Sequence, residues 1–211
     1  MKLLLTSAGL ANESIADALA ELAGKPIDKT KIGFIPMAAN VEAEGKQKIL
    51  QETGDLKSQG FNSVDIIDPS ADNLDWRPRL ESADVIFVGG GNTFHLLDQM
   101  RKTGLGEWLK ENLERKVYAG VSAGTIVACK TIGVASIEPA DPNLPGLTDL
   151  SGLGLVDFEV EPHCDNERFG IIRSYAKGKN HPVYAIDDAT ALKVVDNNVQ
   201  AVGRGRWEKY E

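Results

Sequence analysis

The sequence predicts an α/β fold: a doubly wound, mostly parallel sheet flanked by helices, of the flavodoxin-like type, with antiparallel additions near the C-terminus. Two observations predict it. Short β-rich runs alternate with helical patterns through the first half of the chain, which is the order of repeating βα units. Residues 84–88 read Asp-Val-Ile-Phe-Val, and this apolar run does not alternate with polar residues, as expected when helices cover both faces of a parallel sheet.

The first half of the chain carries the βα repeat. Capping residues agree with it, because Asn12 and Thr93 are types that begin helices, and glycines stand at positions where a helix C-terminus wants a left-handed residue. These glycines are Gly24, Gly60 and Gly104. The strands are expected at 2–6, 31–36, 63–67, 84–88 and 116–121, and the helices near 12–23, 42–59 and 93–115.

The second half of the chain has a different texture. Pro139, Pro142 and Pro145 mark a loop-like stretch, and a further strand is expected at 155–161. From 183 to 202 the pattern predicts strands, the last pair of which is closed by an Asp-Asn-Asn turn. In doubly wound sheets ligands bind outside the carboxyl ends of the strands, so functional residues are expected there.

The bulk properties fit one domain that spans residues 1–211. The formal net charge is -8, and no cluster of Lys and Arg is dense enough to neutralise a run of phosphates, so nucleic acid is not expected as a partner. The apolar run at the N-terminus is too short for a signal peptide, and no stretch approaches the length of a membrane span. We therefore expect a cytoplasmic protein without a membrane partner, and a homodimer stays open.

Neither a metal nor another cofactor is expected. Cys129 and Cys164 are the only two cysteines, and they lack the C-x-x-C spacing of zinc sites and redox motifs. Two isolated cysteines also do not make a disulfide framework.

The most informative segment is Gly120-Val121-Ser122-Ala123-Gly124, which follows an apolar strand and leads into a helix of small residues. This is the pattern of a nucleophile elbow, where a sharp turn exposes a serine hydroxyl at a helix N-terminus. The glycines allow the close backbone approach that such a turn needs. The free N–H groups of the helix would stabilise an oxyanion, which is the charge that develops in acyl transfer. A plain structural turn is the alternative interpretation.

A serine hydroxyl needs a base and the base needs a carboxylate. His163 is the best-placed histidine, because it follows the carboxyl end of the strand predicted at 155–161, whereas His95 and His181 have ordinary structural interpretations. Asp188, at the end of the strand that begins at Val183, is the preferred carboxylate. Glu138, in the proline-rich loop, is the alternative acid.

A second glycine cluster, Gly89-Gly90-Gly91-Asn92-Thr93, follows the buried strand 84–88 and opens a helix. Such a loop binds an anion with its backbone N–H groups. It lacks the G-x-G-x-x-G spacing and the Lys-Ser/Thr pair of nucleotide-binding loops. We therefore favour an oxyanion hole, formed with the N–H of Ala123, over a phosphate site.

These blocks together resemble the peptidase E and cyanophycinase family of serine peptidases, whose fold is similar to that of class I glutamine amidotransferases. The matching segments are 87–93, 120–124, 162–163 and 185–191, which in order and spacing span most of the chain. The resemblance implies that Ser122 is the nucleophile and His163 the base, with the amides of Gly90, Gly91 and Ala123 around the oxyanion and Asn92 beside them. Relatives commonly carry Glu where this chain has Asp188.

The resemblance also implies a substrate class, namely short peptides cleaved by a dipeptidase or aminopeptidase. Peptidase E is similar in cleaving dipeptides with an N-terminal Asp, which requires a cation for the aspartate side chain. Arg168 and Arg173, on the helix predicted after His163, are candidates for that contact, and surface arginines are the alternative interpretation.

Rival functions belong to other classes. A glutaminase would need Cys at the elbow, where this chain has Ser122, and Cys164 is a poor nucleophile for His163 because neighbouring residues on extended backbone point to opposite sides. The non-enzymatic alternative is a small-molecule module of the same fold, whose glycine loops bind an anionic ligand without turnover.

Overall fold

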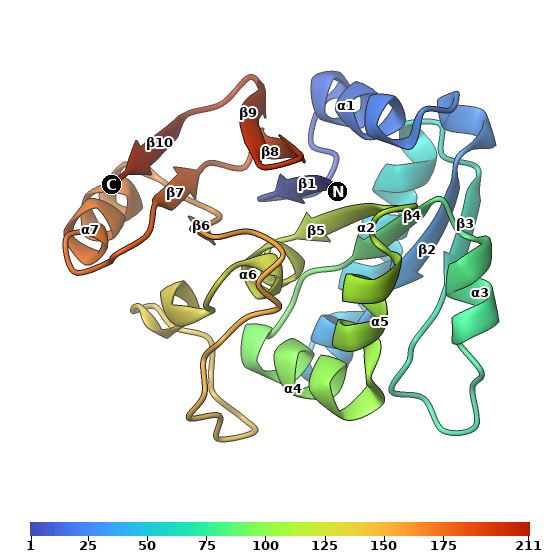
Figure 1. Cartoon of the computed structure of the whole chain (residues 1–211), viewed down its shortest axis with the longest axis horizontal. Coiled ribbons are helices and arrows are strands. Elements are labelled where there is room, and N and C mark those ends of the chain that lie inside the picture. Colours follow the sequence, from blue (N-terminus) through green and yellow to red (C-terminus); the bar gives the residue numbers. More distant parts are fainter.

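A seven-stranded sheet forms the centre of the molecule (Figure 1). The computed structural model describes residues 1–211 throughout. The strands of this sheet are β1 (Lys2–Thr6), β2 (Lys31–Ile35), β3 (Ser63–Ile66), β4 (Val85–Val88), β5 (Val117–Val121), β8 (Thr190–Val195) and β9 (Asn198–Gly203). Their order is β3-β2-β4-β5-β1-β8-β9, in which the first five are parallel and β8 and β9 are antiparallel to their neighbours. The predicted fold class is therefore confirmed, including the antiparallel additions.

A second, smaller sheet lies at one end of the molecule, and the sequence did not predict it as separate. It consists of β6 (Glu159–Glu161), β7 (Val183–Ile186) and β10 (Trp207–Tyr210), in the order β10-β7-β6. β6 is shorter than the strand expected at 155–161. Leu155 is buried and apolar as a strand residue would be, but its N–H bonds to the carbonyl of Ala128 at 2.9 Å instead of pairing within a sheet.

Helices cover both faces of the central sheet, as a doubly wound fold requires. α1 and α2 pack their apolar side chains into the core on one face, while α3 to α6 belong to the larger core on the other, and α7 packs on the small sheet. The bounds are α1 (Glu13–Ala23), α2 (Gly45–Ser58), α3 (Arg77–Ser82), α4 (Thr93–Thr103), α5 (Leu105–Asn112), α6 (Ala123–Ala128) and α7 (Asn166–Ala176), with single 3₁₀ turns η1 (Ile27–Lys29), η2 (Met37–Val41) and η3 (Gly133–Ser136).

The helix ends match those predicted from the capping residues, with two differences. Asn12 caps α1 as predicted, and Gly24 ends that helix with a left-handed φ of 67°. Asn92 rather than Thr93 caps α4, since its side chain accepts the N–H of His95 at 2.8 Å. Gly104 ends α4 at a φ of 74°, and α5 begins at the next residue, so the helix expected at 93–115 is two helices.

Three strands bring the functional loops to one edge of the sheet. β5 lies between β4 and β1, with Val88 opposite Gly120 and Thr6 opposite Val121. The residues that follow these strands therefore lie side by side at their carboxyl ends, where ligands bind in such sheets.

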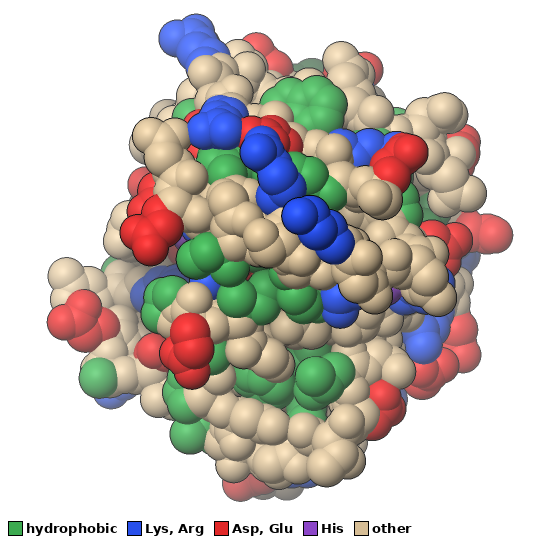
Figure 2. Space-filling view, turned by 90° about the vertical axis from the view of Figure 1, so that its left-hand side faces the viewer, with side chains coloured by type: hydrophobic (Ala, Val, Ile, Leu, Met, Phe, Trp, Pro, Cys, Tyr) green, Lys and Arg blue, Asp and Glu red, His purple; other side chains and the backbone are tan.

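Neither the helices nor the charges of the surface point to a membrane span or a single-sign patch on the face of α7. No helix in the structure has both the length and the apolar character needed to cross a bilayer. The face that bears α7 carries acidic and basic side chains interspersed with apolar ones (Figure 2). Some of these charges pair across elements, as Arg173 of α7 does with Glu208 of β10 at 2.9 Å.

Candidate active site

Ser122 occupies the sharp turn between β5 and α6. Its φ of 49° and ψ of -109° lie in a region that non-glycine residues rarely adopt and that costs about 1–3 kcal/mol. The flanking glycines permit this turn. A Cβ on Gly120 would lie 2.6 Å from the backbone of Gly124, and a Cβ on Gly124 would lie 2.2 Å from the carbonyl oxygen of Val88. The segment therefore has the geometry of a nucleophile elbow.

His163 comes from the small sheet and meets Ser122 at the edge of the central one. It follows β6 with a left-handed φ of 57°. Its Nε2 lies 2.9 Å from the Oγ of Ser122, and its Nδ1 lies 2.5 Å from Oδ1 of Asp188. We call these three side chains the Ser-His-Asp array. It joins segments that lie 41 and 25 residues apart in the chain.

Asp188 and not Glu138 is the carboxylate next to His163. Asp188 lies in the turn between β7 and β8, whereas the carboxylate of Glu138 accepts the N–H of Ala140 at 3.3 Å in its own loop. Partial burial alone would raise the pKa of the Asp188 carboxyl, but the hydrogen bond from Ser7 and the nearby His163 outweigh it and lower that pKa. Asp188 is therefore ionised and able to orient the imidazole.

Ser7 is a member of the site that the sequence did not reveal. It is fully buried directly after β1. Its Oγ donates to Oδ1 of Asp188 at 2.7 Å and accepts the backbone N–H of His163 at 2.7 Å. One hydroxyl thus fixes both the carboxylate and the left-handed backbone of the histidine.

The loop after β4 supplies backbone N–H groups, but not all those expected. The N–H of Gly90 donates to the carboxyl of Glu52 on α2 at 3.0 Å, so it is occupied. The N–H of Gly91 has no partner in the protein, and Ala123 is the first residue of α6, where backbone N–H groups lack helical partners. Gly91 and Ala123 are therefore the better candidates for an oxyanion hole. Burial raises the pKa of Glu52 to about 7.

Asn92 has a structural position rather than a place in the cavity. It is fully buried, and besides capping α4 it donates from Nδ2 to the carbonyl of Pro142 at 2.9 Å. The next residue, Thr93, donates its N–H to the carboxylate of Asp141 at 2.9 Å. Both bonds tie the proline-rich loop to the glycine loop.

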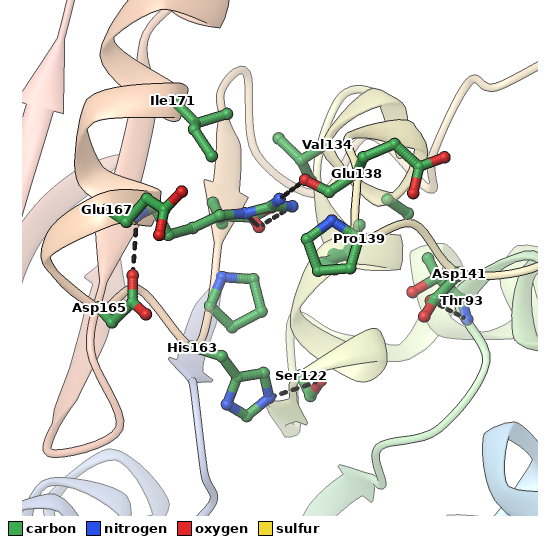
Figure 3. A pocket seen from close by; sticks show the side chains of 15 residues that line it. Thr93, Ser122, Val134, Glu138, Pro139, Asp141, His163, Asp165, Glu167 and Ile171 are labelled. Carbon is green, nitrogen blue, oxygen red and sulfur yellow. Dashed lines mark hydrogen bonds and ion pairs between the residues drawn. The ribbon is translucent and has the colours of Figure 1, made fainter.

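Two cavities flank the Ser122–His163 pair. The first has a volume of about 470 Å³ and is lined by the proline-rich loop and the start of α7 (Figure 3). In that view Ser122 and His163 lie at one end of the cavity and Ile171 at the other. The second, of about 600 Å³, lies between the pair and α2. Ser122 and His163 line both cavities.

Arg168 lines the first cavity, but its guanidinium is already bonded within the protein. Its Nε bonds to buried Glu161 at 2.5 Å, and the other two guanidinium nitrogens bond to the carbonyls of Glu138 and Ile137 at 2.7 and 3.1 Å. Arg173, the other candidate, pairs with Glu208 and lies over the ring of Tyr210. Arg168 is thus bonded at all three of its guanidinium nitrogens, and Arg173 lines neither cavity.

The remaining candidate nucleophile, Cys164, and the other two histidines are not part of the Ser-His-Asp array. Burial raises the pKa of the Cys164 thiol to about 12, so it is protonated at neutral pH. His181 bonds to buried Glu159 at 2.6 Å, and His95 sits on α4 with its Nε2 buried and unpaired. Burial also lowers the pKa of His95.

The sequence matches a known family over almost its whole length. The model of peptidase family S51 matches residues 3–202. The chain belongs to peptidase family S51. An uncharacterized peptidase of Pasteurella multocida is 32% identical, covering 97% of this chain and 98% of its own. Peptidase E of a Nostoc species is 27% identical over 82% of this chain and 72% of its own.

A solved structure agrees with this assignment. A Listeria monocytogenes protein assigned to peptidase E superposes with a TM-score of 0.78 at 27% identity, covering 95% of this chain and 96% of its own. Family S51 membership confirms the resemblance found in the sequence and makes the chain a serine-type peptidase.

Proposed function

We propose that this S51 peptidase hydrolyses short peptides through an acyl-enzyme on Ser122. His163 takes the hydroxyl proton as Ser122 attacks the peptide carbonyl, and it returns that proton to the leaving amine. The C–N bond breaks and the acyl group stays on Ser122. Water, activated by His163 in turn, attacks the ester carbon and releases the acid, so that one water is consumed per peptide bond.

One observation carries the proposal, namely the unbroken row of contacts from Asp188 through His163 to Ser122. With its proton on Nδ1, the imidazole donates to Asp188 and presents the lone pair of Nε2 to the hydroxyl 2.9 Å away. Asp188 then stabilises the imidazolium that forms during attack. The N–H groups of Gly91 and Ala123 are proposed to bind the oxyanion.

The cavities support short substrates. Their volumes of about 470 and 600 Å³ accommodate a few residues on the two sides of the cleaved bond. The relatives named peptidase E, together with the resemblance in the sequence, support a dipeptidase or aminopeptidase. We propose peptides with an N-terminal Asp among its substrates.

The test is hydrolysis of a panel of dipeptides and aminoacyl-coumarins by the wild type and by Ser122→Ala. We expect turnover to fall on the order of a million-fold, the loss that follows removal of the nucleophile in a comparable triad. Ser136→Ala is the matched control, because Ser136 is exposed in η3. Full turnover by Ser122→Ala contradicts the mechanism, and tight binding of peptides by the wild type without turnover favours the non-catalytic alternative.

A further inference from the structure

The two cavities beside Ser122 differ in whether the cationic side chain that lines each one is already bonded within the protein. Arg168, in the first, has all three guanidinium nitrogens bonded within the protein. Lys48 lines the second, together with Ser122 and His163, and its ammonium forms no ion pair or hydrogen bond within the protein. An unpaired ammonium in a cavity next to the nucleophile is the group most able to receive an anion.

The Lys48 side chain lies against the glycine loop, in the same cavity as Ser122 and His163. A Cβ on Gly90 would lie 3.0 Å from Cε and 3.2 Å from Nζ of Lys48, so the missing side chain leaves room for the lysine to lie against the loop. Lys48 is half-buried on α2. Its ammonium is therefore adjacent to the residue that precedes Gly91, a proposed oxyanion donor.

The other charges of this cavity are acidic, and none of them forms an ion pair within 4 Å of the Lys48 ammonium, although Glu52 attracts it at longer range. Glu42, Glu44 and Asp55 are exposed, so solvent screens them. Glu52 is engaged with the N–H of Gly90, and its raised pKa of about 7 leaves it partly protonated near neutral pH. An anionic substrate group in this cavity thus has one attractive partner and several repulsive neighbours, which makes its affinity depend strongly on Lys48.

We propose that Lys48 binds a carboxylate of the peptide substrate in the cavity between Ser122 and α2. The inference rests on the proposed peptidase function and names the group that selects the substrate. Two carboxylates have this chemistry: the side chain of an N-terminal Asp, and the C-terminal carboxylate of a dipeptide. An ammonium–carboxylate hydrogen bond in a half-buried site exceeds a neutral one in strength, so its loss is measurable.

The experiment measures kcat/KM for Asp-Leu, Asp-Leu-amide, Asn-Leu and Asn-Leu-amide with the wild type, Lys48→Met and Lys48→Arg. We expect Lys48→Met to lose about tenfold or more on substrates with the recognised carboxylate, chiefly through KM, and Lys48→Arg to recover part of it. Loss on both Asp substrates identifies the side chain, and loss on both free-acid substrates identifies the C-terminus. Asn-Leu-amide should be cleaved equally by all three proteins.

Two controls separate the possible failures. Lys46→Met removes an exposed lysine of the same helix, which lines a different depression and should behave as wild type. Labelling of Ser122 by a fluorophosphonate reports whether the catalytic centre of Lys48→Met is intact. Equal loss on all four substrates, or no loss on any, overturns the role of Lys48 while leaving the peptidase function standing. If the wild type cleaves none of them and Ser122→Ala matches it on every other peptide, both proposals fail.

Discussion

Ser7 shows how a single residue outside the Ser-His-Asp array controls its geometry. Its hydroxyl bonds to Asp188 and to the backbone of His163, each at 2.7 Å. We expect Ser7→Ala to lower kcat/KM about tenfold to a hundredfold, because a hydrogen bond to a charged group contributes about 1.5–3 kcal/mol and both catalytic partners lose their anchor. Steady-state kinetics on the best dipeptide measures the effect, and most of it should appear in kcat.

The same substitution has a pH signature that a general loss of packing would lack. The hydrogen bond from Ser7 helps to lower the pKa of Asp188, so its stabilisation is present above the ordinary pKa of Asp and is lost as pH falls through the lowered one. The difference in unfolding free energy between wild type and Ser7→Ala should therefore shrink in acid. Ser174→Ala, whose hydroxyl bonds only to the carbonyl of Gly170, serves as the control. A difference that is constant with pH would contradict the assignment.

The residues of the site could be predicted from the sequence where a local pattern marks them. They could not be predicted where only tertiary contacts bring them to the site. Ser122 lies in a recognisable strand–glycine–serine–glycine turn, and His163 follows a strand. Ser7 lies in an ordinary Thr-Ser-Ala-Gly segment, and only the pairing of β1 with β5 and β8 brings it to the site. Arg168 was a candidate for a substrate carboxylate because nothing in the sequence shows that Glu161 is buried against it.

At the scale of elements, the elbow depends on the absence of side chains. We expect Gly120→Ala to lower the free energy of unfolding by about 1–3 kcal/mol, because the new methyl would meet backbone atoms of Gly124 and Thr125 at 2.6–2.7 Å and these atoms cannot move independently. The turn at Ser122 would shift with them, so activity should also fall. Urea denaturation and a dipeptide assay measure the two effects.

Gly170→Ala is the matched control for that substitution. Gly170 lies exposed within α7, and a Cβ there would meet no atom within 4 Å. Replacement of a helical Gly by Ala favours the helix by about 1 kcal/mol, so stability should rise and activity should not change. Equal stability changes in the two variants would show that backbone contact at the elbow is not what selects glycine.

Elements with strong periodicity were predictable, and short or interrupted ones were not. The strands of the parallel sheet lie within a residue of their expected ranges, mainly because most of them contain a continuous apolar run; β3, with the sequence Ser-Val-Asp-Ile, is the exception. α3, with only 6 residues and a proline in its first turn, gave no helical period. β10, with the sequence Trp-Glu-Lys-Tyr, was missed because it has only 4 residues, all of them at least partly exposed at a sheet edge.

At the scale of the whole molecule, the array is assembled from two sheets. Ser122 follows β5 of the central sheet and His163 follows β6 of the small one, while Asp188 lies in the turn that passes from β7 to β8 and thus from one sheet to the other (Figure 1). The sequence placed each residue at a strand end correctly. It could not show that the strands belong to separate sheets, because pairing partners are set by long-range packing.

Asp187 secures the passage between the sheets without touching Ser122 or His163. Its carboxylate accepts the N–H groups of Ala189 and Arg206 at 3.0 and 2.6 Å and the hydroxyl of Thr190 at 2.8 Å. We expect Asp187→Ala to lower stability by about 1–3 kcal/mol and kcat about tenfold, since three donors lose their acceptor and the turn that carries Asp188 loosens. Asp187→Asn should lose less, and Asp72→Ala, in an exposed loop, nothing. Denaturant titration measures the stability, and steady-state kinetics below the unfolding transition measure kcat. If Asp187→Ala is less stable but still turns over at the wild-type rate, Asp188 is positioned by Ser7 alone.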